Sequence, residues 1–457
     1  MSTTHPVPQH NTRIGLNYFP DTLHYREVDL QTWLPLLKSM GVRWLTLISP
    51  TTRAIPEGFI KGLLENGIEP VLHFQEKLSP SPNKHEFEVL LKSYAAWGVR
   101  YIALFDRPNM QSAWSDENWV QQQLVDRYLD IFIEYAEMVC QLEMYPILSP
   151  LEPGGDFWDT AFLRSALQGI KQRGHQRLLS RLVIGAYAWP GNRSLDWGAG
   201  GPERWPGARP YFTPKEEQNQ LGFRIFDWYN TLSEAALNTR LPIILLSTGS
   251  RLGEQRESHR PEVSEQQHAS QNLNIALLLA GDEKAAGKFD PIPKNVLAGN
   301  FQLLSADSAD PQVNQAWFRG SGDILPVVSE FQKWWSLQEK PQPKSIQTPA
   351  PVIEAVEEPD DDPPAKSPKL IKHYLLLPVY EWGISDKHLE VIQPFIKKFA
   401  PTVGFSLDEA GLAEIVTIVG GEESFSEEVV DKFEQTGCQV RRIAGDGTSI
   451  ATLLAEK

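Results

Sequence analysis

Short apolar segments alternate with amphipathic segments over residues 1–337. Eight segments are apolar at successive positions, which is typical of strands buried on both faces of a parallel sheet. They cover residues 15–20, 42–50, 68–75, 99–109, 144–153, 181–190, 241–249 and 295–304. Apolar residues between them recur at helical spacing, as at Leu30, Trp33 and Leu37 before Gly41. The pattern therefore predicts strand and helix in regular alternation.

The number of these repeats indicates the fold. Eight strand–helix units predict an α/β fold of the (β/α)8 or TIM-barrel type. A doubly wound open sheet is the alternative, and it usually carries a glycine fingerprint after its first strand. Here the first strand ends in Asn17, Tyr18, Phe19 and Pro20, without such glycines. We therefore expect the barrel.

A change in composition divides the chain. Residues 338–369 contain eight prolines and an acidic run, and they have few large apolar residues, so we expect a disordered Pro-rich acidic linker. Residues 370–457 return to apolar segments at 373–382, 402–406, 414–421 and 439–445, with helical segments between them. They predict a small parallel α/β domain. The expected domains are therefore 1–337 and 370–457, joined by 338–369.

The candidate site follows from the barrel, because function in this fold lies at the carboxyl ends of the strands. Flat aromatic rings beside polar side chains suit a sugar, whose C–H face packs on a ring while its hydroxyls bond polar groups. The candidate substrate-binding residues at strand ends and in the following loops are Asn17, Tyr18, His73, Asp106, Arg107, Asn109, Trp114, Trp158, Tyr187, Trp189, Trp197, Trp205, Ser247 and Asn300. The other interpretation is that the tryptophans only pack loops onto the barrel.

Two strands of the predicted barrel resemble clan-A glycoside hydrolases. That family ends its fourth strand in aromatic-Asn-Glu-Pro-Asn, and this chain has IALFDRPNM, in which Phe105, Pro108 and Asn109 match. The family's acid/base Glu corresponds to Arg107. The seventh strand reads PIILLSTGS, and Ser247 falls at the position of the nucleophilic Glu. The resemblance implies a glycosidase-derived barrel over roughly residues 13–337.

The two replacements bear on chemistry. Retaining hydrolysis needs two carboxyl groups about 5–5.5 Å apart. Arginine cannot act as a general acid, and Ser247 has no base beside it in the sequence. We therefore predict a pseudoenzyme that binds an oligo- or polysaccharide without that mechanism. The alternative is an active hydrolase with Glu152 and Asp106 as displaced carboxylates. The competing interpretation gives both residues a structural role: Asp106 pairs with Arg107 or another arginine, and Glu152 caps a loop or helix.

The end of the chain resembles the cell-wall-binding repeat (type 2). The match runs from Val416 to Lys457 and includes Gly420-Gly421, Arg442-Ile443-Ala444-Gly445, Thr448 and Ala451. The resemblance implies a cell-wall partner for residues 370–457. That family is exported and works in several copies, whereas one copy is visible here, so a protein partner is the alternative. A third hypothesis makes the whole chain a non-enzymatic scaffold that acts through 370–457.

Composition excludes several classes. A net charge of −15 disfavours nucleic acid and anionic membranes as partners. No segment approaches the ~18 apolar residues of a membrane span. His73 lacks a partner at metal-ligand spacing, so we expect no metal and no cofactor. Only Cys140 and Cys438 are present, so we expect no disulfide, and the first residues lack the pattern of a secretory signal, so we expect a cytoplasmic protein.

Overall fold

The computed structural model describes residues 5–282, 289–338, 369, 371–377, 395–396, 398–399, 401–404, 407–419 and 425–443. Contacts within the chain divide it into two compact units, Met1–Ile346 and Gln347–Lys457. The expected linker, 338–369, lies outside the described residues except for Gln338 and Lys369.

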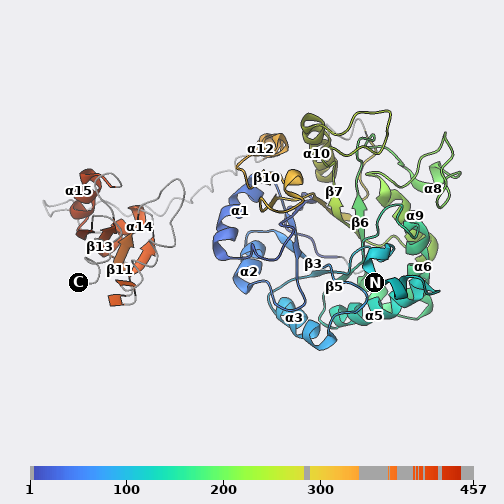
Figure 1. The fold of residues 1–457 in the computed structure, drawn as a ribbon, viewed down its shortest axis with the longest axis horizontal. Coiled ribbons are helices and arrows are strands. Elements are labelled where there is room, and N and C mark those ends of the chain that lie inside the picture. Colours follow the sequence, from blue (N-terminus) through green and yellow to red (C-terminus); the bar gives the residue numbers. More distant parts are fainter. Residues whose placement is uncertain are drawn as a thin grey trace, which may run out of the picture. The chain divides into compact units, whose positions relative to one another are not determined.

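The first unit is a closed barrel of eight parallel strands in the order β1 to β8 (Figure 1). The strands are β1 (Ile14–Asn17), β2 (Trp44–Ile48), β3 (Glu69–Phe74), β4 (Tyr101–Leu104), β5 (Tyr145–Leu148), β6 (Val183–Ala188), β7 (Ile243–Thr248) and β8 (Val296–Phe301). The barrel closes where β1 pairs with β8, with Gly15 opposite Asn300. The α/β barrel prediction is confirmed. Each strand is shorter than its apolar segment, since the segments also included residues of the following loops.

Helices lie around the outside of the strands (Figure 1). They are α1 (Glu27–Ser39), α2 (Glu57–Glu65), α3 (Lys84–Ala96), α4 (Asp116–Trp119), α5 (Leu124–Gln141), α6 (Asp159–Gln172), α7 (Gln176–Arg181), α8 (Gly201–Arg204), α9 (Ile225–Leu237), α10 (Glu265–Ala280) and α12 (Pro326–Gln338). The buried side chains of α5, among them Leu129, Phe132 and Ala136, share one face and join the core between helices and strands. None of the helices in the described ranges is long and apolar enough to cross a membrane.

Two short 3-10 helices and a two-stranded sheet complete this unit. The 3-10 helices are η1 (Gln111–Ala113) and η2 (Val313–Gln315). The strands β9 (Ser305–Ala306) and β10 (Phe318–Arg319) pair in parallel after β8. The sequence did not predict this addition, because two-residue strands leave no periodic pattern.

The barrel interior is filled by side chains from the strands. Trp44, Val71, Tyr101, Ile147 and Ile244 belong to one buried cluster that is separate from the core under the helices. Large rings such as Trp44 and Tyr101, whose centroids lie 5.4 Å apart, take up most of the available space. A barrel of eight strands is just wide enough for such packing. Side chains therefore pack the interior of the barrel, and sites in this fold lie at the carboxyl ends of the strands.

The second unit is a four-stranded parallel sheet in the order β12–β11–β13–β14. Its elements are β11 (Ile371–Leu376), β12 (Thr402–Gly404), α14 (Leu407–Gly411), β13 (Ala413–Val419), α15 (Glu427–Gln435) and β14 (Gln439–Ile443). Tyr374, Val416, Ile418 and Phe433 form its core. The repeat motif positions Gly420-Gly421, Ala444-Gly445, Thr448 and Ala451 lie outside the described residues.

Gly15 allows β1 to pack closely against Trp44 of β2 and Asn300 of β8, where the barrel closes. A Cβ at this position would overlap Asn300 Oδ1 and would lie 2.8 Å from Trp44 Cβ. We predict that Gly15→Ala lowers the free energy of unfolding by about 1–3 kcal/mol, because the packed interior cannot shift to admit a methyl group. Thermal and denaturant unfolding would measure the change.

The matched control is Gly58→Ala. Gly58 lies in the first turn of α2, and a Cβ there meets nothing within 4 Å. Alanine should leave stability unchanged or raise it by up to about 1 kcal/mol. Equal effects of the two substitutions would contradict the overlap argument.

Candidate functional site

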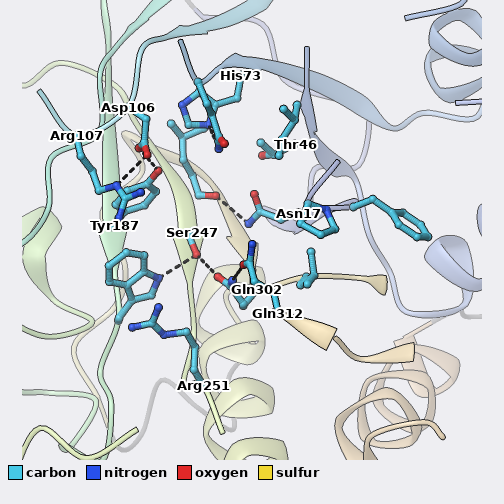
Figure 2. A pocket seen from close by; sticks show the side chains of 17 residues that line it. Asn17, Thr46, His73, Asp106, Arg107, Tyr187, Ser247, Arg251, Gln302 and Gln312 are labelled. Atoms are coloured by element: carbon cyan, nitrogen blue, oxygen red, sulfur yellow. Dashed lines mark hydrogen bonds and ion pairs between the residues drawn. The ribbon is translucent and has the colours of Figure 1, made fainter. Parts of the chain in front are cut away.

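A cavity of about 210 Å³ opens at the carboxyl ends of the barrel strands. Figure 2 shows that polar side chains from several strands face one another across it. The cavity is lined by Asn17, Phe19, Pro20, Thr46, Ile48, His73, Gln75, Asp106, Arg107, Tyr187, Trp189, Leu246, Ser247, Arg251, Gln302, Leu303 and Gln312. Seven predicted site residues are thus brought together: Asn17, His73, Asp106, Arg107, Tyr187, Trp189 and Ser247.

The end of β4 presents Asp106 in a tight turn. Its neighbours Phe105 and Arg107 have φ values of 61° and 45°, in the left-handed region that residues other than glycine rarely adopt. Backbone N–H groups fix this turn, with Phe105 N bonded to Phe74 O and Arg107 N bonded to Pro150 O. Such backbone strain is concentrated at functional sites. It therefore favours a functional role for the turn.

Both carboxylate oxygens of Asp106 are engaged. The Tyr187 hydroxyl donates to Oδ1 at 2.6 Å, and Arg107 Nε donates to Oδ2 at 2.8 Å. Burial, followed by the charge of Asp106, raises the pKa of Tyr187 well above its usual value, so the hydroxyl keeps its proton. Asp106 therefore pairs with Arg107, as one of the two sequence interpretations expected.

Glu152 lies beside this turn and does not line the cavity. Its Oε2 is 3.7 Å from Arg107 Nη1, and its side chain is 27% exposed. Burial raises the pKa of Glu152, although Arg107, Arg256 and Arg251 act in the opposite direction. Asn109 holds the Glu152 backbone, because its Oδ1 accepts from Glu152 N and its Nδ2 donates to Glu152 O, both at 2.9 Å. Asn109 is fully buried and positions this loop.

His73 is buried in the wall of the cavity. Its Nε2 is 3.0 Å from Phe105 O, which can only accept, so Nε2 carries the proton. Its Nδ1 then accepts from Gln75 Nε2 at 3.2 Å. Burial lowers the pKa of His73, which keeps the ring neutral at pH 7. His73 thus orients Gln75 and supports the β4 turn.

Ser247 is held between two side chains across the cavity. Its Oγ accepts from Trp189 Nε1 and donates to Gln302 Oε1, both at 2.9 Å. A register shift between β6 and β7 after Ala186 places Tyr187 opposite Ser247. The rings of Tyr187 and Trp189 stack with centroids 4.6 Å apart. No histidine or lysine contacts Ser247 Oγ within the described residues, so the hydroxyl lacks a base that would activate it.

The other predicted site residues lie away from the cavity. Tyr18 and Asn300 are completely buried, Tyr18 in the core under the helices and Asn300 beside Gly15 inside the barrel. The loop tryptophans pack locally: the indoles of Trp114, Trp197 and Trp205 donate to Pro108 O, Asn219 Oδ1 and Ala199 O, and Trp158 packs against Tyr211. These four side chains behave as the loop-packing interpretation expected.

Ten of the seventeen lining residues are not among the predicted site residues, and the polar ones are Thr46, Gln75, Arg251, Gln302 and Gln312. Thr46 lies within β2, and a polar residue in an otherwise apolar strand was a signal that could have found it. Arg251 and Gln312 come from loops whose course is set by tertiary contacts, so no local pattern marks them.

One group in the described part of the chain has metal-ligand character, and it lies beside the cavity wall. His24 contacts Asp21 Oδ1 through Nδ1 at 2.9 Å and Asp307 Oδ1 through Nε2 at 3.3 Å. The His24 ring also stacks on Phe19. Each ring nitrogen of His24 thus has a carboxylate partner within the protein itself.

Asp159, the first residue of α6, is a completely buried carboxyl group that bonds to two loops after β5 and β6. Asp159 accepts from Gly154 N at 3.0 Å, from Gln220 Nε2 at 2.6 Å and from the Tyr229 hydroxyl at 3.1 Å. Burial raises the pKa of Asp159 to about 6, although these three bonds oppose the shift. The residue therefore joins the β5–α6 loop to the β6–α9 loop.

The sequence and the fold were compared with known proteins. No family model and no curated protein matches the sequence. Similar solved structures include a family 39 glycoside hydrolase from Bacteroides cellulosilyticus, with a TM-score of 0.48, 14% identity and coverage of 73% of this chain and 66% of that one. This chain thus spans just under two thirds of that protein.

Two further structures are similar over a comparable part of this chain. One is a β-xylosidase from Caulobacter crescentus, with a TM-score of 0.43, 13% identity and coverage of 72% of this chain and 69% of that one. The other is a family 128 endo-β-1,3-glucanase from Sorangium cellulosum, with a TM-score of 0.41, 12% identity and coverage of 70% and 97%.

Asp159 should make stability depend on pH. Its folded-state pKa of about 6 lies above the unfolded value of about 3.9, so its stabilising contribution is complete below about pH 4 and is lost as pH rises through 6. An amide side chain at this position would accept and donate hydrogen bonds without a charge. We predict that the free energy of unfolding of Asp159→Asn, compared with that of the wild type, rises by about 2–3 kcal/mol between about pH 4 and pH 7.

Unfolding of both proteins by denaturant across this pH range would test the prediction. Asp130→Asn is the control, because Asp130 is exposed and pairs with Arg173 at the surface. Parallel pH profiles for the wild type and Asp159→Asn would contradict a buried, titrating Asp159.

Proposed function

We propose that the barrel binds a saccharide in the cavity at its strand ends and does not cleave it by the two-carboxylate mechanism. The observation that carries this proposal is the lining of the cavity. Amide, hydroxyl, carboxylate and guanidinium groups surround a volume of about 210 Å³, beside the stacked rings of Tyr187 and Trp189. This mixture of fixed polar groups and apolar faces suits a sugar ring.

The state of the polar groups supports binding over catalysis. The guanidinium of Arg107 stays protonated and so cannot act as a general acid. Both oxygens of Asp106 already accept hydrogen bonds. The Ser247 hydroxyl donates to the Gln302 amide oxygen, which is too weak a base to activate it. The resemblance at β4 and β7 suggests that a glycosidase site has become a binding site.

Hydrolysis by Glu152 and Asp106 is the second candidate. It is favoured by one observation, the raised pKa of Glu152, since a general acid must hold its proton near neutral pH. Against it stands the position of Arg107, which forms ion pairs with both carboxylates. The charge of Arg107 acts to lower the pKa of Glu152 and so opposes the proton that Glu152 would need as a general acid.

A role for residues 370–457 in binding a protein or cell-wall partner remains a prediction from the sequence. Much of the motif that suggested it lies outside the described residues. In the proposal, the small domain holds the barrel near its target, and the barrel supplies recognition. Cytoplasmic location is likewise an expectation from the first residues of the chain.

The full-length protein should bind saccharides without turning them over. We predict that the correct oligosaccharide, at about a hundred times its dissociation constant, adds ~2.7 kcal/mol to the free energy of unfolding. A thermal-shift panel would detect this shift. Trp189→Ala should abolish it, whereas Trp114→Ala, at a loop tryptophan away from the cavity, should lower the melting temperature but keep the ligand-induced shift.

Reducing-end assays on the same panel would separate the two candidates. Binding without released sugar supports the proposal. Release by the wild type that disappears in Glu152→Gln would establish the hydrolase instead, and an entirely flat panel would refute both.

A further inference from the structure

We propose that the ligand of the cavity carries a carboxylate group, as a uronic acid does, and that Arg251 and Arg107 recognise it. This inference rests on the proposed saccharide-binding function and adds the chemical class of the sugar. Both guanidinium groups line the same cavity, and their side chains are 32% and 45% exposed. Arginine presents paired N–H groups whose spacing matches the two oxygens of a carboxylate.

Arg251 is held in place before any ligand arrives. Its guanidinium carbon lies 4.5 Å from the ring centroid of Trp189, and its Nη2 donates to Glu254 Oε1 at 3.2 Å. Its Nε and Nη1 make no hydrogen bond within the described residues. The stacked ring and the carboxylate thus fix the group, while two donors stay available. A preorganised guanidinium loses little conformational entropy on binding an anion.

Arg107 is the second arginine of the cavity, and Figure 2 shows it beside Asp106 and Tyr187. Its Nε donates to Asp106 and its Nη1 lies 3.7 Å from Glu152, which leaves Nη2 without a partner in the described chain. The left-handed backbone at Arg107 sets the direction of the side chain. Each arginine therefore combines a fixed position with a free donor.

The charges around the cavity permit an anion in an otherwise acidic protein. The net charge of the chain is −15, a field that repels anions. At the cavity wall, however, Asp106 is the one carboxylate among the lining residues, against two guanidinium groups. Arg256 also bonds Glu254, so that this carboxylate is shared by two arginines. Guanidinium groups therefore outnumber carboxylates by one among the lining residues, whereas the wider cluster, with Glu152, Glu254 and Arg256, is balanced in charge. The preference for an anion thus rests on the free arginine donors.

A carboxylate uses the free groups of this lining more fully than a neutral sugar does. Ser247 Oγ donates to Gln302 Oε1, and Gln302 Nε2 donates to Gln312 Oε1, so these groups are already paired. Thr46 Oγ1 and Asn17 Oδ1 have no hydrogen-bond partner within the described residues and can bond sugar hydroxyls. The free arginine donors, in contrast, suit an acceptor-rich group such as a carboxylate.

The test compares matched ligands on the full-length protein. Methyl glycosides of glucuronic and galacturonic acid are titrated against those of glucose and galactose, with ligand-observed NMR as the readout. We expect at least one uronide to bind about tenfold or more tighter than its neutral partner, as a charge-assisted pair adds over a neutral contact. Methyl esters of the uronides should bind like the neutral sugars.

Variants of the full-length protein test whether Arg251 causes the preference for uronides. Arg251→Gln should remove the uronide preference, and Arg251→Lys should restore part of it, because the charge remains and the paired donors are lost. Arg240→Gln, at an exposed arginine that pairs with Glu234 away from the cavity, should leave it intact. Melting temperatures close to that of the wild type would show that the variants fold.

The outcomes separate this inference from the function on which it rests. Equal binding of uronides and neutral sugars overturns the inference and leaves saccharide binding in place. A uronide preference that survives Arg251→Gln overturns the assignment of that residue. Binding of none of the glycosides, together with a flat oligosaccharide panel, refutes the proposed function and this inference with it.

Discussion

The contacts of Asp106 limit what the barrel mouth can do. One oxygen accepts from Tyr187 and the other from Arg107, which in turn reaches toward Glu152. These side chains come from the carboxyl ends of β4, β5 and β6, which are neighbouring strands of the barrel. Their mutual bonds satisfy charges that burial would otherwise penalise. A carboxylate whose two oxygens both accept hydrogen bonds is held in one position, which suits the proposed role in recognition.

The fold was predictable because its signals are local and repeated. Strands buried on both faces are apolar at successive positions, and the helices between them are amphipathic, so eight repeats identify the barrel without any tertiary information. The limits of each strand were less predictable. Residues after a strand can be apolar and buried too, as Phe105 is after β4, and a pattern of apolar positions cannot distinguish the two cases.

The candidate site was predictable only in part, for a geometrical reason. Residues at strand ends, such as His73 and Tyr187, have their place set by the barrel itself. Loop residues do not: Trp114 and Trp197 turn into their own loops, where the indole N–H finds an acceptor, whereas Arg251 turns into the cavity. The direction of a loop side chain depends on which partner satisfies its polar atom, and sequence position does not encode that partner.

Binding and catalysis make opposite demands on such a cluster. A glycosidase needs one carboxyl group that releases a proton and another whose charge changes during the reaction. In the resemblance on which the proposed function rests, Arg107 and Ser247 stand at the positions of these two groups, and both side chains are bonded to neighbours. In the proposed function, the guanidinium of Arg107 therefore takes part in binding an acceptor-rich ligand and not in proton transfer.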